Sequence, residues 1–306
     1  MNHLLLDAAE TAARLPYPAL VSELVRVLRD PLACVPPRLV QALPGGGSLF
    51  VMPAFDAEVA ITKLITFTPG NSGSRTPTIQ GDVVVFDVHS GARRLVLDGP
   101  TVTARRTAAV SLLAAQWLAP NLEGPLLIVG AGAQGQAHLE AFAQGLGIRE
   151  VLIHSRSEAS AHVLAARARE IGLQARVVAS ADAALAECPL VVTCTPAAQV
   201  VLRATPRDDA FIAAVGAFTP AMIELAPEFT QHCARTGRIV VDTRDADHEA
   251  GDLLQAGLDV ARIPSLRELD GSAAGTRAPV LFKSCGWAGW DLAAARTALR
   301  QPAGPA

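Results

Sequence analysis

LLIVGAGAQG, residues 126–135, is the stretch of this sequence that decides the fold. Four apolar residues typical of a buried strand lead into a glycine-rich turn of the form G-x-G-x-x-G, and helix-like sequence follows. In this context Gly130 permits a tight turn, Gly132 lets the backbone approach a pyrophosphate, and Gly135 allows close helix–strand packing. The N–H groups at the start of the helix favour phosphate. We therefore expect a Rossmann domain whose dinucleotide-binding loop comprises Gly130, Gly132, Ala133, Gln134 and Gly135.

The end of the next expected strand, 151–154, indicates which dinucleotide is bound. An NAD site usually carries Asp or Glu here, about 20 residues after the glycine loop, to hold the ribose 2′-hydroxyl. In this sequence the strand runs into Ser155 and Arg156 without an acid. A guanidinium can pair with a 2′-phosphate, and a serine can donate to it. The sequence thus favours NADP(H) over NAD(H); the alternative is that Arg156 is solvated and Glu158 takes the acidic role.

Beyond the glycine loop, strands and helices alternate as in a doubly wound sheet. Ligands bind at the carboxyl ends of such strands, so Thr195 and Val215 are expected at the cofactor. The strands are expected at 126–129, 151–154, 176–178, 190–194, 211–215 and 238–242, and the helices at 136–144, 159–171 and 181–186.

The first part of the chain shows no such alternation. Strands separated by turns indicate an antiparallel or mixed sheet, and an amphipathic helix is expected at 286–299, after the Rossmann pattern ends. The predicted fold class is α/β, with a doubly wound Rossmann domain at 120–285. An N-terminal α+β domain at 1–119 is completed by the C-terminal helix within 286–306. Its expected elements are a helix at 18–29, strands at 48–53, 60–67 and 81–88, and a helix at 103–118 with Thr103 as N-cap.

Composition argues against several classes of protein. The net charge of −3 gives no basic surplus, so nucleic acid is not an expected partner. The sequence contains no apolar run long enough to span a membrane and no recognisable signal peptide, so we expect a cytoplasmic protein without membrane contact. Five scattered cysteines form no C-x-x-C. The acidic run at 242–249 matches no metal motif and is expected to be a solvated loop, so no metal site is predicted.

Three cations stand out from apolar surroundings in the first part of the chain. They are Arg38 in VPPRLV, Lys63 in AITKLITF and Arg106 in TARRTAAVS. A lone lysine within a strand, or an arginine pair on a helix, usually lies on a solvated face. Spacing alone does not bring the three together.

Nine segments of this sequence stand out, in order along most of the chain: PPR at 36–38, MP at 52–53, KLITFTPGN at 63–71, TPTIQG at 76–81, TARRTAA at 103–109, the GAGAQG loop, VGAFTPAMIEL at 215–225, VVD at 240–242, and FKSCG with DLAAA within 282–295. Together they resemble the ornithine cyclodeaminase/mu-crystallin family. The resemblance implies a homodimer in which the N-terminal domain carries substrate binding and dimerisation and the C-terminal helix returns to it.

The same resemblance assigns roles to the three cations. It implies that Arg38, Lys63 and Arg106 hold the carboxylate of a small amino or imino acid and line the reacting centre. Thr78 is implied to lie beside them. A guanidinium binds a carboxylate in a bidentate fork, which supplies charge and orientation. Orientation matters because hydride transfer requires the two reacting carbons near contact.

The sequence departs from ornithine cyclodeaminases at Phe218. Those enzymes carry an Asp here, which grips the substrate amine and serves in proton transfer. The loop resembles instead that of family members reducing cyclic imino acids, and an apolar Phe218 suits a methylene ring. The resemblance thus implies NADPH-dependent reduction of Δ1-pyrroline-2-carboxylate or Δ1-piperideine-2-carboxylate to L-proline or L-pipecolate, with Lys63 and Arg106 as the catalytic residues. Lys63 is either the proton donor or an electrostatic partner only.

Four alternatives stay open. The chain could be an ornithine cyclodeaminase that uses NAD, with Phe218 as core packing and another acid replacing the Asp. It could be an alanine-dehydrogenase-like enzyme acting on pyruvate and ammonia. It could be a non-catalytic protein that binds NADPH and a small molecule, although pure binding does not require the three cations. Lastly, Thr195 could belong to a simple turn.

Overall fold

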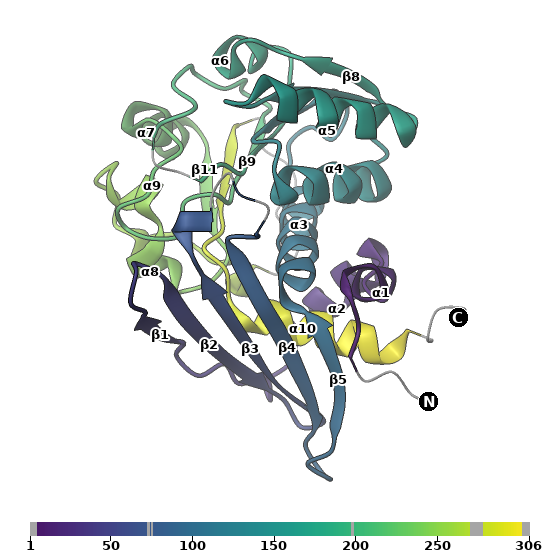
Figure 1. Cartoon of the computed structure of the whole chain (residues 1–306). Helices are drawn as coiled ribbons and strands as arrows, with labels where there is room; N and C mark the ends of the chain where they lie inside the picture. Colours follow the sequence, from purple (N-terminus) through teal and green to yellow (C-terminus); the bar gives the residue numbers. More distant parts are fainter. Residues whose placement is uncertain (1–4, 72–73, 75, 197–198, 270–277, 302–306) are drawn as a thin grey trace. The chain divides into compact units, whose positions relative to one another are not determined.

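The computed structural model describes residues 5–71, 74, 76–196, 199–269 and 278–301 (Figure 1). It divides into two compact units. The first runs to Arg106 and resumes at Trp287, and the second is 107–286. The division falls inside helix α3 (Gly99–Leu118). The domains expected from sequence, 1–119 with 286–306 and 120–285, divide after this helix, and the functions assigned to them stay predictions.

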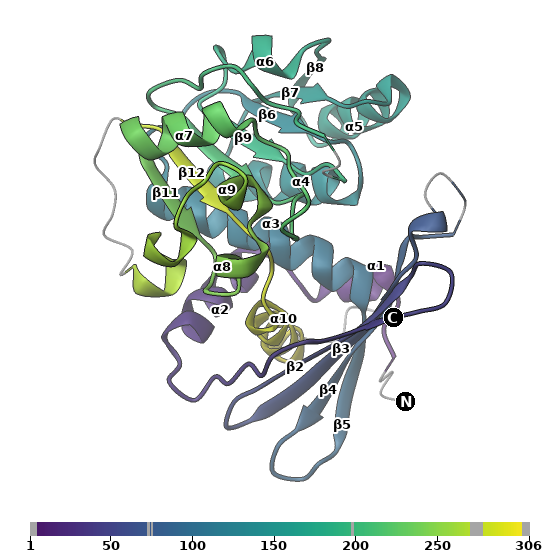
Figure 2. The same cartoon turned by 90° about the vertical axis from the view of Figure 1, so that its left-hand side faces the viewer.

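The first unit is built on a five-stranded antiparallel sheet in which strands follow one another in chain order. Side chains alternate between its faces. Ile61, Lys63 and Ile65 are buried on one face, whereas Leu64 is 45% exposed on the other. Figure 2 shows the strands with α10 (Ala288–Arg300) beside them. The strands are β1 (Leu39–Ala42), β2 (Ser48–Phe55), β3 (Val59–Phe67), β4 (Ile79–Asp87) and β5 (Arg93–Asp98).

Helices α1 (Ala8–Ala13) and α2 (Tyr17–Arg29) complete the first unit with α10. Helix α2 packs against α10, and charged side chains fix the pair. The Nε of Arg296 lies 2.6 Å from Oε1 of the buried Glu23, and its Nη1 lies 2.9 Å from both Asp30 and Asp56. The predicted return of the C-terminal helix to the N-terminal domain is confirmed.

The second unit is a seven-stranded parallel sheet in the order β11-β12-β10-β9-β6-β7-β8. Within this sheet, β6 comes first in sequence and lies near the middle. Strands β7 and β8 follow on one side of β6, and β9 then pairs with β6 on its other side, so the strand order reverses at β6. Ligands of doubly wound sheets bind at such a reversal. The predicted fold class is therefore confirmed. The strands are β6 (Leu126–Val129), β7 (Glu150–His154), β8 (Gln174–Val177), β9 (Leu190–Thr193), β10 (Phe211–Ala214), β11 (Arg238–Val241) and β12 (Val280–Lys283).

Helices connect these strands, and one of them carries a buried histidine. His138, in the helix at Ala133–Leu146, is fully buried: its Nε2 lies 2.9 Å from Oγ of Ser111, and its Nδ1 lies 2.7 Å from the carbonyl oxygen of Gln134. Burial lowers the pKa of His138 to about 4, so it is neutral at neutral pH. The helices are α4 (Ala133–Leu146), α5 (Glu158–Glu170), α6 (Ala181–Ala184), α7 (Pro227–Thr236), α8 (Ala246–Glu249) and α9 (Gly251–Leu254), with 3₁₀ turns at Pro69–Asn71, Val260–Arg262 and Leu266–Glu268.

The expected start of the helix at Thr103 is wrong. Helix α3 begins at Gly99, and the side chain of Asp98 accepts the N–H of Thr101 at 2.8 Å. Gly99-Pro100 suggests a turn in sequence, yet Pro100 lies in the first turn of the helix, where its missing N–H costs nothing. Thr103 is therefore an interior residue of the helix.

Candidate active site

Lys63 lies in the middle of β3 with its side chain on the buried face, 2% exposed. Its Nζ lies 2.7 Å from Oδ2 of Asp291 in the first turn of α10. A buried ammonium requires a partner, and Asp291 is one. The expectation that a lone strand lysine faces solvent is therefore wrong for Lys63.

Asp291 also contacts Arg106 of α3. The Nε of Arg106 lies 3.2 Å from Oδ1 of Asp291, so each cation has its own carboxylate oxygen. Asp291 is fully buried and the Arg106 side chain is 7% exposed. Both contacts are ion pairs by distance, so one carboxylate faces two cations. The cluster therefore keeps positive charge for a further anion.

The environment of Lys63 favours release of its proton. Burial lowers the pKa of Lys63 to about 8; the positive charges of Arg106 and Arg38 lower it too, and Asp291 opposes them. A lysine with a pKa of about 8 is charged at neutral pH and still transfers a proton readily. Arg38 and Arg106 therefore both lie close enough to Lys63 to influence its charge. The spacing of these residues in the sequence did not show this.

Arg38 and Thr78 both lie just before a strand of the same sheet. Arg38 is half-buried and precedes β1. Thr78 is half-buried and precedes β4, and its carbonyl oxygen accepts the N–H of Thr68 at 2.8 Å. The place of Thr78 beside the substrate stays a prediction.

Asp291 is the residue of this cluster that the sequence analysis did not identify. An acid in the first turn of a helix is common because of the helix dipole, so its position alone does not indicate a functional residue. The residues around Asp291 do indicate that it is buried. Trp290 and Leu292 flank it, alanines follow, and residues 288–295 are all buried. A lone acid within an apolar helix end needs a buried cation.

The glycine loop follows β6 as expected. Gly130 has φ +115°, and a Cβ there would lie 2.8 Å from the carbonyl oxygen of Cys194. A Cβ at Gly135 would lie 2.1 Å from the carbonyl oxygen of Gly130. Gly132 differs: among the described residues, its chain neighbours apart, no atom lies within 4 Å of its Cβ position, and its φ is −87°. Packing therefore requires the first and third glycines, whereas the second faces open space that a ligand can fill.

The start of α4 leaves polar groups for such a ligand. Helix α4 begins at the exposed Ala133, and its N-cap residue, Gly132, has no side chain to cap it. The Oε1 atom of Gln134 is buried without a hydrogen-bond partner among the described residues. The uncapped N–H groups, the open side of Gly132 and the orphaned Gln134 oxygen fit a dinucleotide pyrophosphate.

The end of β7 leads into Ser155, which is half-buried, and Arg156, which is exposed. Within the described ranges, no ion pair joins Arg156 to another residue. Glu158 lies at the start of α5, is 84% exposed and lies 3.6 Å from His162. The Arg156 guanidinium is thus available to a phosphate.

Beyond the ends of β9 and β10, a buried carboxylate collects hydrogen bonds. Glu224 accepts the N–H of Thr195 at 2.7 Å, the hydroxyl of Thr195 at 2.9 Å, the N–H of Gly216 at 2.7 Å and the hydroxyl of Thr193 at 3.0 Å. Burial raises the pKa of Glu224, and the charge of Lys283 opposes this. Glu224 therefore fixes Thr195 and the backbone next to Val215, which is half-buried.

A second buried pair supports Glu224. Asp252 accepts the N–H groups of Glu224 and Leu225 at 2.6 and 2.9 Å, and its Oδ2 lies 2.9 Å from Nζ of Lys283. Phe218 lies in the loop ahead of Glu224 and is 37% exposed. The alternative that Phe218 is core packing is therefore wrong. Phe218 belongs to the second unit, whereas Arg38, Lys63, Thr78 and Arg106 belong to the first.

The acidic run at 242–249 is only partly a solvated loop. Asp242 is fully buried and accepts the hydroxyl of Ser284 and the N–H of Gly286, both at 2.8 Å. It binds the backbone that leaves β12. In the described part of the chain, no group of three metal-binding side chains occurs and no helix is both long and apolar enough to cross a membrane.

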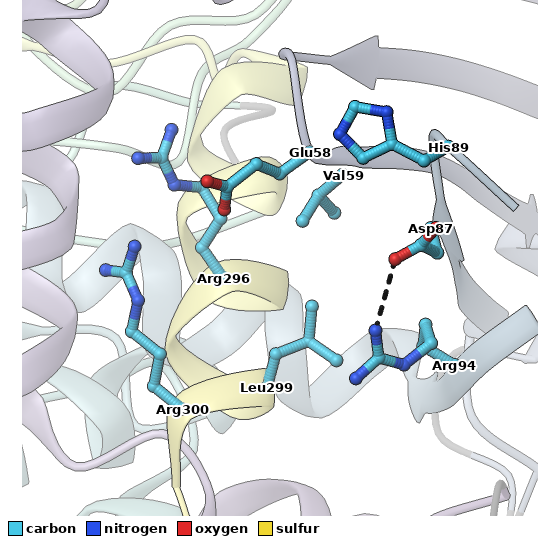
Figure 3. A pocket seen from close by; sticks show the side chains of 8 residues that line it. All are labelled: Glu58, Val59, Asp87, His89, Arg94, Arg296, Leu299 and Arg300. Atoms are coloured by element: carbon cyan, nitrogen blue, oxygen red, sulfur yellow. Dashed lines mark hydrogen bonds and ion pairs between the residues drawn. The ribbon is translucent and has the colours of Figure 1, made fainter.

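A pocket of about 360 Å³ in the first unit contains none of the predicted site residues (Figure 3). Its cations are matched by acids: Arg94 lies 3.3 Å from Asp87, and Arg296 contacts Asp30 and Asp56. These pairs neutralise it, so it is a weaker candidate for a carboxylate than the Lys63 cluster. The lining residues are Glu58, Val59, Asp87, His89, Arg94, Arg296, Leu299 and Arg300.

Comparison with known proteins agrees with this architecture. The chain is 39% identical over 296 residues to Delta(1)-pyrroline-2-carboxylate reductase 1 of Burkholderia multivorans, covering 95% of this chain and 94% of that protein. It is 39% identical over 297 residues to Delta(1)-pyrroline-2-carboxylate/Delta(1)-piperideine-2-carboxylate reductase of Azospirillum brasilense, with the same coverage. The fold matches that of Thermococcus litoralis Delta(1)-pyrroline-2-carboxylate reductase in complex with NADH and L-proline. The TM-score is 0.88 at 24% identity, over 97% of this chain and 96% of that one.

The family model of the ornithine cyclodeaminase/mu-crystallin family matches residues 22–301. This range includes both units and every predicted site residue. The chain therefore belongs to the ornithine cyclodeaminase/mu-crystallin family.

Proposed function

We propose that this protein reduces cyclic imino acids, Δ1-pyrroline-2-carboxylate or Δ1-piperideine-2-carboxylate, to L-proline or L-pipecolate with a nicotinamide dinucleotide. The observation that carries the proposal is the buried cluster of Lys63, Asp291 and Arg106. One carboxylate facing two cations, with Arg38 acting on the same lysine, leaves positive charge in excess. Such a site suits a substrate that brings its own carboxylate. Relatives of matching length are named as reductases of these two imino acids.

The reaction assigns a task to each cation. When bound, the dinucleotide supplies the hydride for C2 of the imine, and the π electrons of the C=N bond move to nitrogen. Arg38 and Arg106 hold and orient the substrate carboxylate. The Nε of Arg106 lies 3.2 Å from Asp291, and its two Nη atoms are the donors proposed for the substrate carboxylate. Lys63 donates the proton to nitrogen or, if the imine arrives protonated, stabilises the bound carboxylate only.

The preferred dinucleotide in this proposal is NADP(H), with NAD(H) less favoured. The loop from Gly130 to Gly135 takes the pyrophosphate, supported by the open side of Gly132 and the uncapped α4. Ser155 and Arg156 take the 2′-phosphate, supported by the exposure of the Arg156 guanidinium and the absence of an acid before Glu158. Thr195 and Val215, at the carboxyl ends of β9 and β10, take the nicotinamide side.

Phe218 is proposed to select the substrate. The loop carries no carboxylate at this position to hold the second amine of ornithine, and an exposed aromatic ring suits an apolar methylene ring.

We also propose a homodimer formed through the outer face of the five-stranded sheet. Register and alternation place Val51, Phe55 and Leu64 on the face opposite Lys63, and Phe55 and Leu64 are 42% and 45% exposed. Exposed apolar side chains gathered on one face of a sheet favour an interaction surface.

The test is NADPH oxidation by the purified protein with each of the two imino acids, with product identified by chromatography. Pyruvate plus ammonium is assayed alongside, and so is ornithine with NAD⁺ for release of ammonia. Proline or pipecolate formed in step with NADPH loss is the expected result. Ammonia from ornithine, or alanine from pyruvate, at a higher kcat/KM would overturn the proposal.

A further inference from the structure

We propose that Asp291 is a positioning residue for this reduction: it fixes Lys63 and Arg106 side by side and leaves their outer donors to the substrate. The inference rests on the proposed function, because it concerns how that site is held in its working form. Asp291 itself need not touch the substrate.

The geometry carries this role. Three elements meet at Asp291, since Lys63 comes from β3, Arg106 from α3 and Asp291 from α10. Oδ2 serves Lys63 and Oδ1 serves Arg106, so the carboxylate sets the spacing between the two cations. Without it, two buried positive charges would face each other and repel strongly. The Lys63 side chain would then be expected to leave its place or lose its proton.

The charges around Lys63 point the same way. The groups that act on it most strongly are Asp291 from α10, Arg106 from α3 and Arg38 from the segment before β1. Asp291 is the acid among them, and it raises the proton affinity that burial and the two arginines lower. Removal of the Asp291 charge therefore lowers the pKa of Lys63 below about 8.

The sequence offers a direct way to observe this. The chain has two lysines, Lys63 and Lys283, so protein labelled with ¹³C at the lysine Cε gives two lysine signals. Lys283 is an internal reference, because it is paired with Asp252 at 2.9 Å and its pKa is raised. Asp56→Asn is the matched control. Asp56 is also buried and also contacts α10, through Arg296 at 2.9 Å, but it is not in the cluster.

The experiment titrates wild type, Asp291→Asn and Asp56→Asn without ligand. Wild-type Lys63 is expected to titrate near pH 8, and in Asp291→Asn its midpoint is expected to fall by roughly one to three pH units. Asp56→Asn should leave the midpoint in place while lowering thermal stability. An unchanged Lys63 midpoint in Asp291→Asn would overturn the inference.

Kinetics separate positioning from a merely structural role. In Asp291→Asn the loss of kcat/KM should be roughly five- to twentyfold larger at pH 8.5 than at pH 6.5, because Lys63 is deprotonated at lower pH. A loss that is equal at both pH values, matching that of Asp56→Asn, would overturn the inference.

If Asp291→Asn does not fold, Asp291→Glu keeps the charge but moves the carboxylate by one methylene. It should leave the Lys63 midpoint near the wild-type value and raise KM, and an unchanged KM would contradict positioning. If wild type reduces no imino acid, the proposed function fails, whereas the titration still decides what Asp291 does to Lys63.

Discussion

At the residue scale, Lys63 and Arg106 carry the proposed chemistry most directly. Lys63→Met and Arg106→Met are each expected to lower kcat/KM for the imino acid by about 100-fold or more, because each removes a charge aimed at the reacting molecule. NADPH affinity should change little, since both residues lie outside the second unit. Steady-state kinetics together with NADPH fluorescence titration measures the two effects. Equal losses of turnover and of NADPH binding would argue against these roles.

The alternation of residues along its strand could have indicated that Lys63 is buried. Lys63 has the same parity as Val59, Ile61 and Ile65, which all lie on the buried face. The opposite face of the strand carries Leu64 besides two threonines, so from sequence alone either face could have been the buried one. The partner of Lys63 was out of reach of sequence reasoning, because Asp291 is more than two hundred residues away in the chain.

Arg156 is the residue on which the cofactor preference turns. Arg156→Ala is expected to raise KM for NADPH by about tenfold or more and to leave KM for NADH within about twofold, since a guanidinium pairs with the 2′-phosphate alone. Comparison of kcat/KM with the two cofactors measures this. A parallel change for both cofactors would show that Arg156 does not read the 2′-phosphate.

At the scale of elements, the glycine loop between β6 and α4 gives a matched pair of variants. Gly132→Ala should keep thermal stability close to that of wild type, because no described residue beyond its chain neighbours lies within 4 Å of the new Cβ, but it should weaken dinucleotide binding by about tenfold. Gly135→Ala should lower stability, because its Cβ would lie 2.1 Å from the carbonyl oxygen of Gly130. Calorimetry and dinucleotide titration distinguish the two. Unchanged binding in Gly132→Ala would contradict the loop assignment.

Elements were predicted best where the pattern was strong. Strand β6, loop and helix α4 follow from apolar residues and spaced glycines, and α2 from its helical apolar stripe. Strands β1, β5 and β12 were not predicted. Strand β5 begins with two exposed arginines, and β12 has four residues and ends in a buried lysine whose partner, Asp252, is distant in sequence. Short strands of this kind are defined by their neighbours in the sheet.

At the scale of the whole molecule, the proposed dimer makes a separate prediction. Leu64→Glu places a charge on the outer face of the sheet and should yield monomers, because burying an unpaired carboxylate is costly. Size-exclusion chromatography with light scattering measures the mass. Thr66→Glu, further along the same face, is a second probe of the same surface. A wild-type protein of monomer mass would contradict the proposed dimer.

The fold class followed from the order of elements, since alternation of strand and helix after residue 120 prescribes a parallel sheet. The charged cluster could not be predicted from the order of elements. Its members come from four separate segments and meet through tertiary packing: Arg38, Lys63, Arg106 and Asp291. The family resemblance supplied three of these four residues, and the structure added Asp291.

The most direct test of the central claim follows the hydride itself. NADPH carrying deuterium at the transferred C4 position is incubated with Δ1-pyrroline-2-carboxylate and the protein, and the product is examined by mass spectrometry and NMR. The account predicts proline with one deuterium at C2 for each NADPH oxidised. Proline without deuterium, or NADPH that stays unoxidised while ornithine releases ammonia, would contradict it.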